Sequence, residues 1–403
     1  MKNDLDYLLS PKAIRDRSTK LFEATVAGKT HFEYHPDKLD SVVDFVVATI
    51  RKNYPDLKIP FHSRWGHFRA GGIDRVQTYL EEKIQALPRE EQGRTKIDLV
   101  ISSVLLDAGA GEGWKYLEAA SGKTFSRSEG LGIASFWMFM DGTFSHDPAH
   151  PLRVTARGLK ALTREKLESA FQVTAENPLV GVEGRLELLR SLGSAIESAP
   201  TIFPGARPGG LFDYLRTLGS EVAAVRLLRA VLDGLGPIWP GRTSLEGVNL
   251  GDCWRHSLLG PLESPSSLIP FHKLSQWLTY SLIEPIEEAG LKITGVYEMT
   301  GLPEYRNGGL LLDRELITLK DPGLLTREHT PDSELIVEWR ALTIVCLDRI
   351  AERVRSQLGI AESDFPLAKV LEGGTWWAGR AAARELRADG SPPLKLKSDG
   401  TVF

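Results

Sequence analysis

The chain has 403 residues and a formal net charge of −4, and its 42% hydrophobic and 25% charged residues are ordinary for a globular protein. This slightly acidic balance argues against a duplex-DNA binder, which usually carries a basic face. Two cysteines, Cys253 and Cys346, are too few for a disulfide framework or a four-sulfur zinc site. The start lacks the apolar stretch of a signal peptide and no run of 18 apolar residues occurs, so we expect a cytoplasmic protein.

Helical periodicity dominates the chain. In residues 36–54 Pro36 suits a first turn, and the apolar residues that follow repeat at helical spacing. Residues 96–107 are apolar nearly all round and predict a buried helix. Further helices are expected at about 9–27, 73–87, 162–172, 183–197, 211–234, 271–289, 333–358 and 375–388.

Strand signals are sparse. The best is 393–403, where Leu and Lys alternate before Asp-Gly and suggest a small hairpin. Residues 291–313 have no clean period and are compatible with short extended pieces. We therefore predict a mainly α, multi-helix fold with few short strands. The stretch 141–152 is the best boundary, between an N-terminal helical region, 1–150, and a C-terminal helical catalytic region, 151–403, unless both form one compact unit.

Nucleotide-binding and metal motifs are incomplete. SGKT at 121–124 resembles the end of a phosphate-binding loop, but the glycine needed five positions before Gly122 is Leu117. No G-x-S-x-G nucleophile motif occurs. We expect no metal and no cofactor, because two histidine pairs lack convincing ligand spacing: His62 with His67, and His146 with His150.

Glu338 and Arg340 lie inside the apolar run 335–347, which predicts a helix in the middle of the protein. A carboxylate there needs a partner, because burying it unpaired costs several kcal/mol. Two interpretations are equally favoured. Glu338 belongs either to a structural ion pair or to a pocket where loss of solvent poises an acid for chemistry.

Two further segments set polar residues beside apolar ones. Residues 270–290 predict a helix whose apolar stripe includes Trp277, with His272 and Lys273 at its N-terminal end, where a lysine opposes the helix dipole. At 303–306, Pro-Glu-Tyr-Arg is followed by Asn-Gly-Gly, which predicts a tight turn. Glu304 on such a turn is typical of a rigid polar site, but an exposed charged turn would have the same sequence pattern.

Aromatic residues cluster with polar ones at 61–68, 236–242, 250–256 and 372–380. These segments contain Arg64, Asp252 and Trp376. Such clusters could form the wall of a pocket for a planar group, but each of them is more often core packing.

These segments together resemble a known family. LLDAGAG at 105–111, GPIWP at 236–240, PFHKLSQWLTYSLIEP at 270–285, LPEYRNGGL at 302–310, EWRALT at 338–343, LEGGTW at 371–376 and SDGTVF at 398–403 are similar to the URC4/Urg3 family of bacterial and fungal uracil catabolism. The resemblance runs nearly end to end. It implies a pathway in which ribosylated uracil is opened to a ribosylurea, from which urea is then released.

A weaker resemblance leads to the queuosine-salvage nucleotide N-glycosidases. FHKLSQWL, LPEYRNGG and VEWRALTIVCLDRI are similar to their lysine, aspartate-tyrosine-arginine and glutamate segments, with Glu304 in place of the aspartate. This implies a fold like helix-hairpin-helix DNA glycosylases and cleavage of an N-glycosidic bond without metal or cofactor.

The resemblance therefore implies an N-ribosyl hydrolase acting on ribosylurea, a small-molecule substrate expected to carry a 5′-phosphate. Neither nucleic acid nor a membrane is an expected partner. Glu304 would stabilise the positive charge on the reacting carbon, orient water or attack directly, and Lys273 would pair with Glu304 or hold a sugar hydroxyl. Arg306 would bind phosphate or a ribose oxygen. Glu338 would hold Arg306 or Arg340 in place or bind the ribose diol. Asp107, His272 and Asp252 are the unranked candidates for protonating the leaving group. The candidate catalytic residues are Glu304, Lys273, Glu338 and Asp107, and the candidate substrate-binding residues are Arg306, Tyr305, Arg340, His272, Trp277, Asp252, Trp376 and Arg64.

Two alternatives stay open. One is an amidohydrolase that cuts the ureido group, and the other is a non-catalytic nucleotide-binding partner in the same pathway. A metal-held water would favour the first, with the four histidines named above as ligands to test. The absence of any turnover would favour the second.

Overall fold

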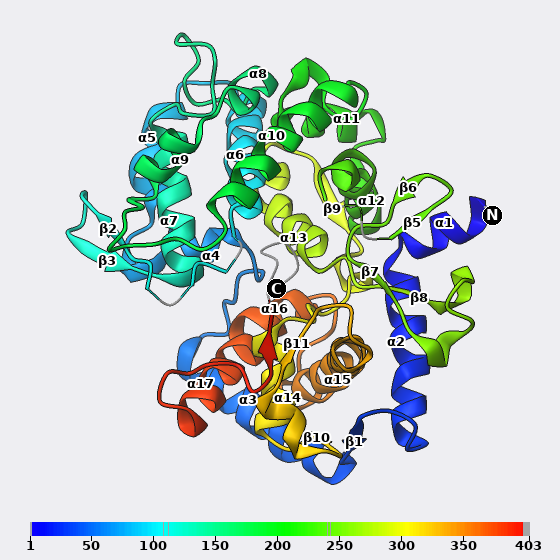
Figure 1. The fold of residues 1–403 in the computed structure, drawn as a ribbon. Coiled ribbons are helices and arrows are strands. Elements are labelled where there is room, and N and C mark those ends of the chain that lie inside the picture. Colours follow the sequence, from blue (N-terminus) through cyan, green and yellow to red (C-terminus); the bar gives the residue numbers. More distant parts are fainter. Residues whose placement is uncertain (1, 108, 112, 240, 242, 398–403) are drawn as a thin grey trace. The chain divides into compact units, whose positions relative to one another are not determined.

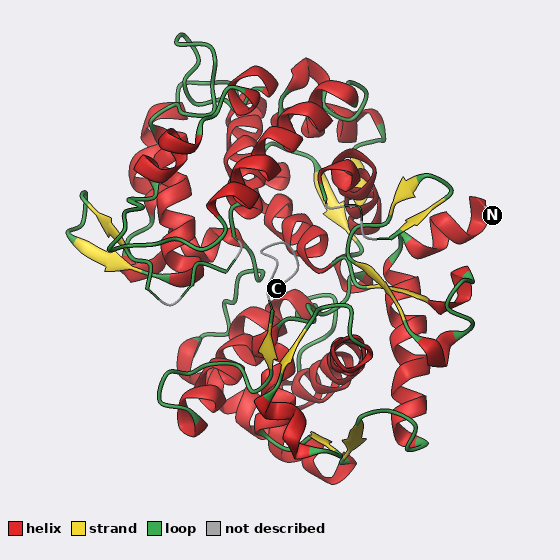
Figure 2. Ribbon diagram, viewed as in Figure 1, coloured by secondary structure: helices red, strands yellow, loops and turns green. Residues whose placement is uncertain are grey.

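The structure, a computed structural model, describes residues 2–107, 109–111, 113–239, 241 and 243–397. Helices make up most of it, and the strands are two or three residues long and scattered among them (Figure 2). Within these ranges each strand pairs with a single partner strand. The predicted mainly α, multi-helix fold with few short strands is confirmed.

The chain divides into two compact units that alternate along the sequence. Unit 1 comprises the described residues of 1–62, 242–276 and 295–398, and unit 2 those of 63–241 and 277–294. Unit 1 therefore contains segments from the beginning, the middle and the end of the described chain, which are coloured from blue to red in Figure 1. The expected boundary near residue 150 lies inside unit 2, away from the points where the chain passes from one unit to the other.

Unit 1 is organised around the long helix α15, Glu334–Leu358, which contacts α2, α3 and α14 (Figure 1). The apolar run predicted to be central is central: residues 335–344 are buried without interruption. Helix α17 contacts α14 and the π-helical turn η11, Leu371–Thr375. The other helices of this unit are α1 Lys2–Leu8, α2 Pro11–Val26, α3 Leu39–Asn53, α14 Tyr305–Asp313, α16 Leu367–Val370, α17 Trp376–Leu386 and the first turn of α13 Lys273–Glu288.

The strands of unit 1 form four small pairs. The antiparallel pairs are β1 Phe32–Tyr34 with β10 Ile317–Leu319, β5 Ser244–Leu245 with β6 Val248–Asn249, and β7 Cys253–Arg255 with β8 Leu268–Pro270. The fourth pair, β11 Glu328–His329 with β12 Lys395–Leu396, is parallel. The predicted hairpin at 393–403 is thus wrong for residues 395–396, which pair with a distant strand, and residues 398–403 lie outside the described ranges.

Unit 2 is a second helical assembly. Helix α6, Arg89–Leu105, contains the predicted buried segment, and residues 95–105 are buried without a break. The other helices are α4 Arg64–Phe68, α5 Glu81–Ile84, α7 Arg127–Met140, α8 Ala156–Lys160, α9 Arg164–Ala170, α10 Val182–Ser198, α11 Leu211–Thr217, α12 Ala224–Leu235 and most of α13. Its strands are β2 Tyr116–Glu118 with β3 Lys123–Phe125, antiparallel, and β4 Glu221–Ala223 with β9 Lys292–Thr294, parallel.

Two departures from the predicted helices have local causes. Residues 211–234 form two helices rather than one, because the chain leaves α11 at Gly219, whose φ is 143°, and pairs as β4 before α12 begins. Helix α7 was not predicted, because its residues 130–136 are buried on every side and therefore show no amphipathic period. Across the described ranges, every helix is too short or too polar to cross a membrane.

Candidate functional site

The predicted site residues separate into two groups. Asp107, Arg64 and Trp277 belong to unit 2. The others belong to unit 1, where they lie in helices α13, α14, α15 and α17 or directly before β7, α13 and α14: Asp252, His272, Lys273, Glu304, Tyr305, Arg306, Glu338, Arg340 and Trp376.

Glu304 is the N-cap of helix α14. Its carboxylate accepts hydrogen bonds from the backbone N–H groups of Arg306 at 2.7 Å and Asn307 at 2.6 Å. The predicted Asn-Gly-Gly turn is therefore wrong, because the capping carboxylate satisfies the first N–H groups and the chain continues as a helix. The negative charge also lies at the positive end of the helix dipole, which stabilises it there.

Glu304 is nevertheless a perturbed acid. The residue is 8% exposed, and burial raises the pKa of Glu304 above the usual glutamate value. The two backbone hydrogen bonds and the charges of Lys273 and His62 act in the opposite direction without cancelling this effect. The charge of Lys273 thus acts on the Glu304 carboxylate, and a buried carboxylate influenced by cations is typical of functional sites.

A network of buried polar groups holds the segment before Glu304. Gln276 of α13 exchanges two hydrogen bonds with Thr300, from Nε2 to Oγ1 at 2.6 Å and from the Thr300 N–H to Oε1 at 3.0 Å. Asn307 donates to the Leu302 carbonyl at 3.0 Å and accepts from the Thr375 hydroxyl at 2.8 Å. The position of the Glu304 carboxylate is thus set from α13 and from η11 as well as from its own helix.

Glycines allow the helices around Glu304 to approach closely. A Cβ at Gly379 of α17 would lie 2.1 Å from the carbonyl oxygen of Arg306, so the backbones of α14 and α17 touch there. A Cβ at Gly308 would lie 2.8 Å from the ring of Trp339, which donates to the Gly308 carbonyl at 3.0 Å. Gly308 therefore serves helix packing rather than a turn.

Asp252 organises the start of α13. Its carboxylate accepts two hydrogen bonds of 2.7 Å from Arg340, one from the Lys273 N–H at 3.0 Å and one from the Trp254 indole at 2.7 Å. Burial alone would raise the pKa of Asp252, but Arg340 outweighs burial and holds this pKa well below its usual range. Asp252 is therefore an ionised positioning group, which removes it from the candidate proton donors.

His272 immediately precedes α13 and has a φ of +47°, in the left-handed region that a non-glycine residue seldom adopts. Its Nε2 lies 2.9 Å from the Leu8 carbonyl oxygen. Burial lowers the pKa of His272, although the Leu8 contact opposes this. A neutral imidazole that donates to a carbonyl is a poor acid, so His272 is also disfavoured as the proton donor. The strained backbone directs the chain from β8 into α13.

Arg306 and Tyr305 pack against each other. The guanidinium lies 4.9 Å from the centre of the Tyr305 ring and donates to the Gly390 carbonyl at 2.7 Å. Arg306 is 5% exposed. These contacts favour a structural role for Arg306, and the predicted phosphate contact stays a prediction.

Glu338 has a different environment from the one expected. It is 2% exposed and accepts hydrogen bonds from the His31 N–H at 2.9 Å and from the His31 ring at 2.8 Å, while His256 Nε2 lies at 3.2 Å. The expected pairing of Glu338 with Arg306 or Arg340 is therefore wrong, because Arg340 turns toward Asp252 and Glu338 toward two histidines. This geometry favours the structural interpretation of Glu338.

Sequence reasoning missed a histidine–carboxylate pair near Glu304. His62 Nδ1 lies 2.7 Å from Glu372 Oε2, and Tyr54 donates to the other oxygen of Glu372 at 3.2 Å. The His62 ring also lies 5.7 Å from the ring of Trp376, a predicted site residue. The sequence does carry a signal, since the aromatic clusters at 61–68 and 372–380 contain His62 and Glu372, but nothing in the sequence pairs these two segments.

The residues predicted in unit 2 do come together. Arg64 is fully buried, donates to the Ser103 carbonyl at 2.6 Å, lies 3.3 Å from Asp107, and has its guanidinium carbon 5.2 Å from the centre of the Trp277 ring. Burial lowers the pKa of Arg64, and Asp107 opposes this. Asp107 is thus the partner of a buried cation.

The histidines considered as metal ligands have separate partners. His146 lies 2.9 Å from the Thr155 hydroxyl, His150 lies 2.7 Å from Asp147, and His67 lies 3.4 Å from Arg64. Among the residues that the structure describes, no three or more His, Cys, Asp or Glu side chains form a group that could hold a metal ion.

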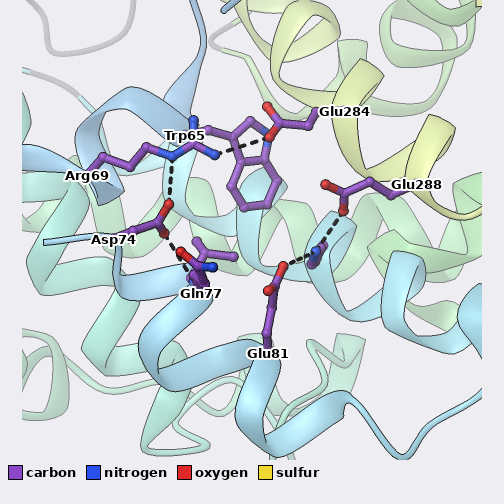
Figure 3. A pocket seen from close by; sticks show the side chains of 9 residues that line it. Trp65, Arg69, Asp74, Gln77, Glu81, Glu284 and Glu288 are labelled. Atoms are coloured by element: carbon purple, nitrogen blue, oxygen red, sulfur yellow. Dashed lines mark hydrogen bonds and ion pairs between the residues drawn. The ribbon is translucent and has the colours of Figure 1, made fainter.

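Unit 2 also contains a charged cavity of about 260 Å³ (Figure 3). Arg69 lies between Asp74 and Glu284, at 2.9 and 3.2 Å, and Lys96 lies between Glu81 and Glu288, at 2.8 and 2.6 Å. Each cation in this cavity is already shared by two carboxylates, so four acidic side chains surround two basic ones. The cavity contains none of the predicted site residues.

Comparison with known proteins places these features in a family. Residues 7–403 match the family model described as "Protein of unknown function (DUF1688)". The chain is 40% identical over 438 residues to "Uracil catabolism protein 4" of Lachancea kluyveri, covering 100% of this chain and 99% of that protein. It is 42% identical over 409 residues to "Protein urg3" of Schizosaccharomyces pombe, covering 98% of each. The predicted resemblance is confirmed, and the chain belongs to this family, the URC4/Urg3 family.

Proposed function

We propose that the protein acts in uracil catabolism as a hydrolase that cleaves the N-glycosidic bond of ribosylurea, or of its 5′-phosphate, to urea and the free sugar. The name of the Lachancea kluyveri relative supports the pathway. The observation that carries the chemistry is Glu304, a buried carboxylate with a raised pKa, fixed by two backbone N–H groups and accompanied by Lys273.

This arrangement suits cleavage at an anomeric carbon. As the C1′–N bond breaks, positive charge develops on the sugar, and a carboxylate nearby stabilises it or orients the attacking water. The water oxygen bonds to C1′, the electron pair of the broken bond leaves on nitrogen, and that nitrogen gains a proton. Glu304 is the proposed carboxylate, and Lys273 is proposed to bind a sugar hydroxyl or keep Glu304 ionised.

Several contacts hold Glu304 rigidly, which supports this role. Its own helix holds both oxygens, Asn307 connects it to Thr375, and Gln276 holds the preceding segment. A catalytic group must be held within a fraction of an ångström of its productive position, and supporting hydrogen bonds of this kind provide that precision.

The direct test is to incubate the protein with ribosylurea, with and without a 5′-phosphate, and to measure free urea and the sugar product by mass spectrometry. Release of urea together with ribose or ribose 5-phosphate supports the proposal. Ribosylamine with carbon dioxide and ammonia would instead show ureido cleavage, and no turnover of either compound would favour a non-catalytic partner. Both of these results would overturn the proposal.

Glu304→Gln tests the residue assignment. The amide keeps one acceptor for the helix cap, so we expect a loss of about 1 kcal/mol in unfolding free energy, whereas turnover should fall by at least ~100-fold. Thr163→Ala is the matched control, because Thr163 caps α9 through the Lys166 N–H at 3.3 Å and touches none of the site residues. It should lower stability similarly and leave turnover per folded molecule unchanged. A Glu304→Gln variant with normal turnover would exclude Glu304 as the essential carboxylate.

A further inference from the structure

Urea is a poor leaving group, so the proposed reaction needs an acid whose identity the sequence left open. The structure removes two of the three candidates. Asp252 is ionised in its bidentate pair with Arg340, and His272 is buried with its Nε2 at the Leu8 carbonyl. Asp107, the third, is the ion-pair partner of the buried Arg64, at 3.3 Å.

We propose that His62, held by Glu372, is the acid that protonates the departing urea. This inference rests on the proposed function. The Nδ1–Glu372 hydrogen bond of 2.7 Å fixes the ring orientation and the tautomer, so that the proton transferred to the leaving group is the one on Nε2. A carboxylate bound to the opposite ring nitrogen is the usual way to orient a catalytic imidazole and stabilise its protonated form.

The surroundings of His62 fit this role. The residue is 7% exposed, its N–H donates to the Ala368 carbonyl at 3.0 Å, and Tyr54 supports the second oxygen of Glu372. Ring, carboxylate and phenol therefore form one rigid assembly whose members come from distant parts of the sequence. Such orientation is required for proton transfer, because a general acid must reach its target at hydrogen-bond distance.

The same assembly is connected to Glu304. Glu372 and Thr375 belong to the π-helical turn η11, and Thr375 donates to Asn307, whose N–H binds the Glu304 carboxylate. Trp376, next along the chain, contacts the His62 ring. The charge of His62 also acts on Glu304, where it opposes the rise in pKa that burial causes. An acid and a carboxylate near one another are what cleavage of a glycosidic bond requires.

The proton balance closes without a further reactant. His62 gives its Nε2 proton to the urea as the C1′–N bond breaks and the electron pair leaves with the urea. Water adds to C1′ and loses a proton, which restores the imidazolium of His62. One water is consumed, and one urea and one sugar are released.

The test separates a general acid from a structural residue by the leaving group. A general acid accelerates a reaction about 10²–10⁴-fold when the leaving group needs protonation. It accelerates the reaction little when the leaving group departs without a proton. His62→Gln should therefore lower kcat/KM for ribosylurea by about 10²–10⁴-fold and should leave 4-nitrophenyl β-D-ribofuranoside, whose phenolate leaves unprotonated, nearly unaffected. Glu304→Gln should reduce both activities, because both reactions develop charge on the sugar.

His150→Gln is the matched control. His150 forms a histidine–carboxylate pair of the same 2.7 Å length with Asp147, but on an exposed segment of unit 2. This variant should leave both activities unchanged. Thermal unfolding and circular dichroism of each variant establish that it is folded before its activity is compared with that of the unmodified protein.

A second measurement keeps the proposal falsifiable if the nitrophenyl riboside is not turned over. His62→Ala should then regain ribosylurea cleavage on addition of imidazole, which supplies the missing acid, whereas His150→Ala should not respond. Equal loss by His62→Gln on both substrates, normal activity of that variant, or no imidazole rescue would overturn the role of His62 while leaving the proposed function intact. No urea release by the unmodified protein would overturn the proposed function itself.

Discussion

The Asp252–Arg340 pair gives the most quantitative prediction. Arg340 is 1% exposed and the Asp252 side chain 14%, and two hydrogen bonds of 2.7 Å join them. Removing one partner of a buried pair costs about 3–5 kcal/mol, because the other charge stays buried without compensation. Since Asp252 is partly exposed, we expect Asp252→Asn to cost about 3 kcal/mol.

For a unit of this size, each kcal/mol lowers the unfolding midpoint by about 2–4 °C. Asp252→Asn should therefore lower the midpoint of unit 1 by roughly 6–12 °C in calorimetry. Asp40→Asn is the matched control, because Asp40 binds Arg353 at the same 2.7 Å but both side chains are more than half exposed. It should produce no measurable change, as exposed pairs contribute little.

The pair also predicts a pH dependence. Because the folded pKa of Asp252 is lowered, its contribution to stability is complete above the unfolded value of about 3.9 and is lost as the pH falls toward the folded pKa. The difference between the unmodified protein and Asp252→Asn should thus be constant from neutral pH to about pH 4 and shrink below it. A double-mutant cycle with Arg340→Met should show a coupling of about 2 kcal/mol. Additive effects in this cycle would refute the reasoning.

Four further predictions follow from the same geometry. Burial raises the pKa of Glu304. In a pH–rate profile, kcat/KM should therefore fall in acid with a midpoint above the ordinary glutamate value of about 4.3. A midpoint at or below that value would contradict the role of a buried carboxylate. Glu338→Gln should lower the unfolding free energy by about 1–3 kcal/mol, because it weakens bonds to two histidines, and should leave turnover per folded molecule unchanged; a selective loss of turnover would restore its catalytic role. Gly379→Ala should lower both stability and turnover, because its Cβ would meet the α14 backbone at 2.1 Å. Gly184→Ala in α10 is the control and should stabilise the protein slightly, because the space around its Cβ is open. Equal melting points of the two variants would contradict the close packing at Gly379. Dialysis against EDTA should leave urea release unchanged, and a loss restored by one divalent metal would favour ureido hydrolysis.

The sequence by itself determined the helical class and most helix positions. A 3.6-residue period of apolar side chains is a local property of the chain, so α3, α10 and α13 could be predicted from the spacing of residues alone. It also indicated candidate site residues, since Glu304 and Lys273 lie in motifs that carry the family resemblance and Asp252 lies in an aromatic cluster. These inferences needed no knowledge of which segment lies beside which.

The tertiary structure decided the partners. Glu338 binds His31 and His256, and His62 binds Glu372, across separations of 307, 82 and 310 residues that no local pattern encodes. Helix α14 forms in place of the predicted turn because Glu304 caps it and because Gly308 lets its backbone approach Trp339, and the second contact exists only after packing. Local spacing thus predicts which elements form, whereas the charge, burial and hydrogen bonds of a site depend on contacts between distant segments, and these are set by the packing of the whole unit.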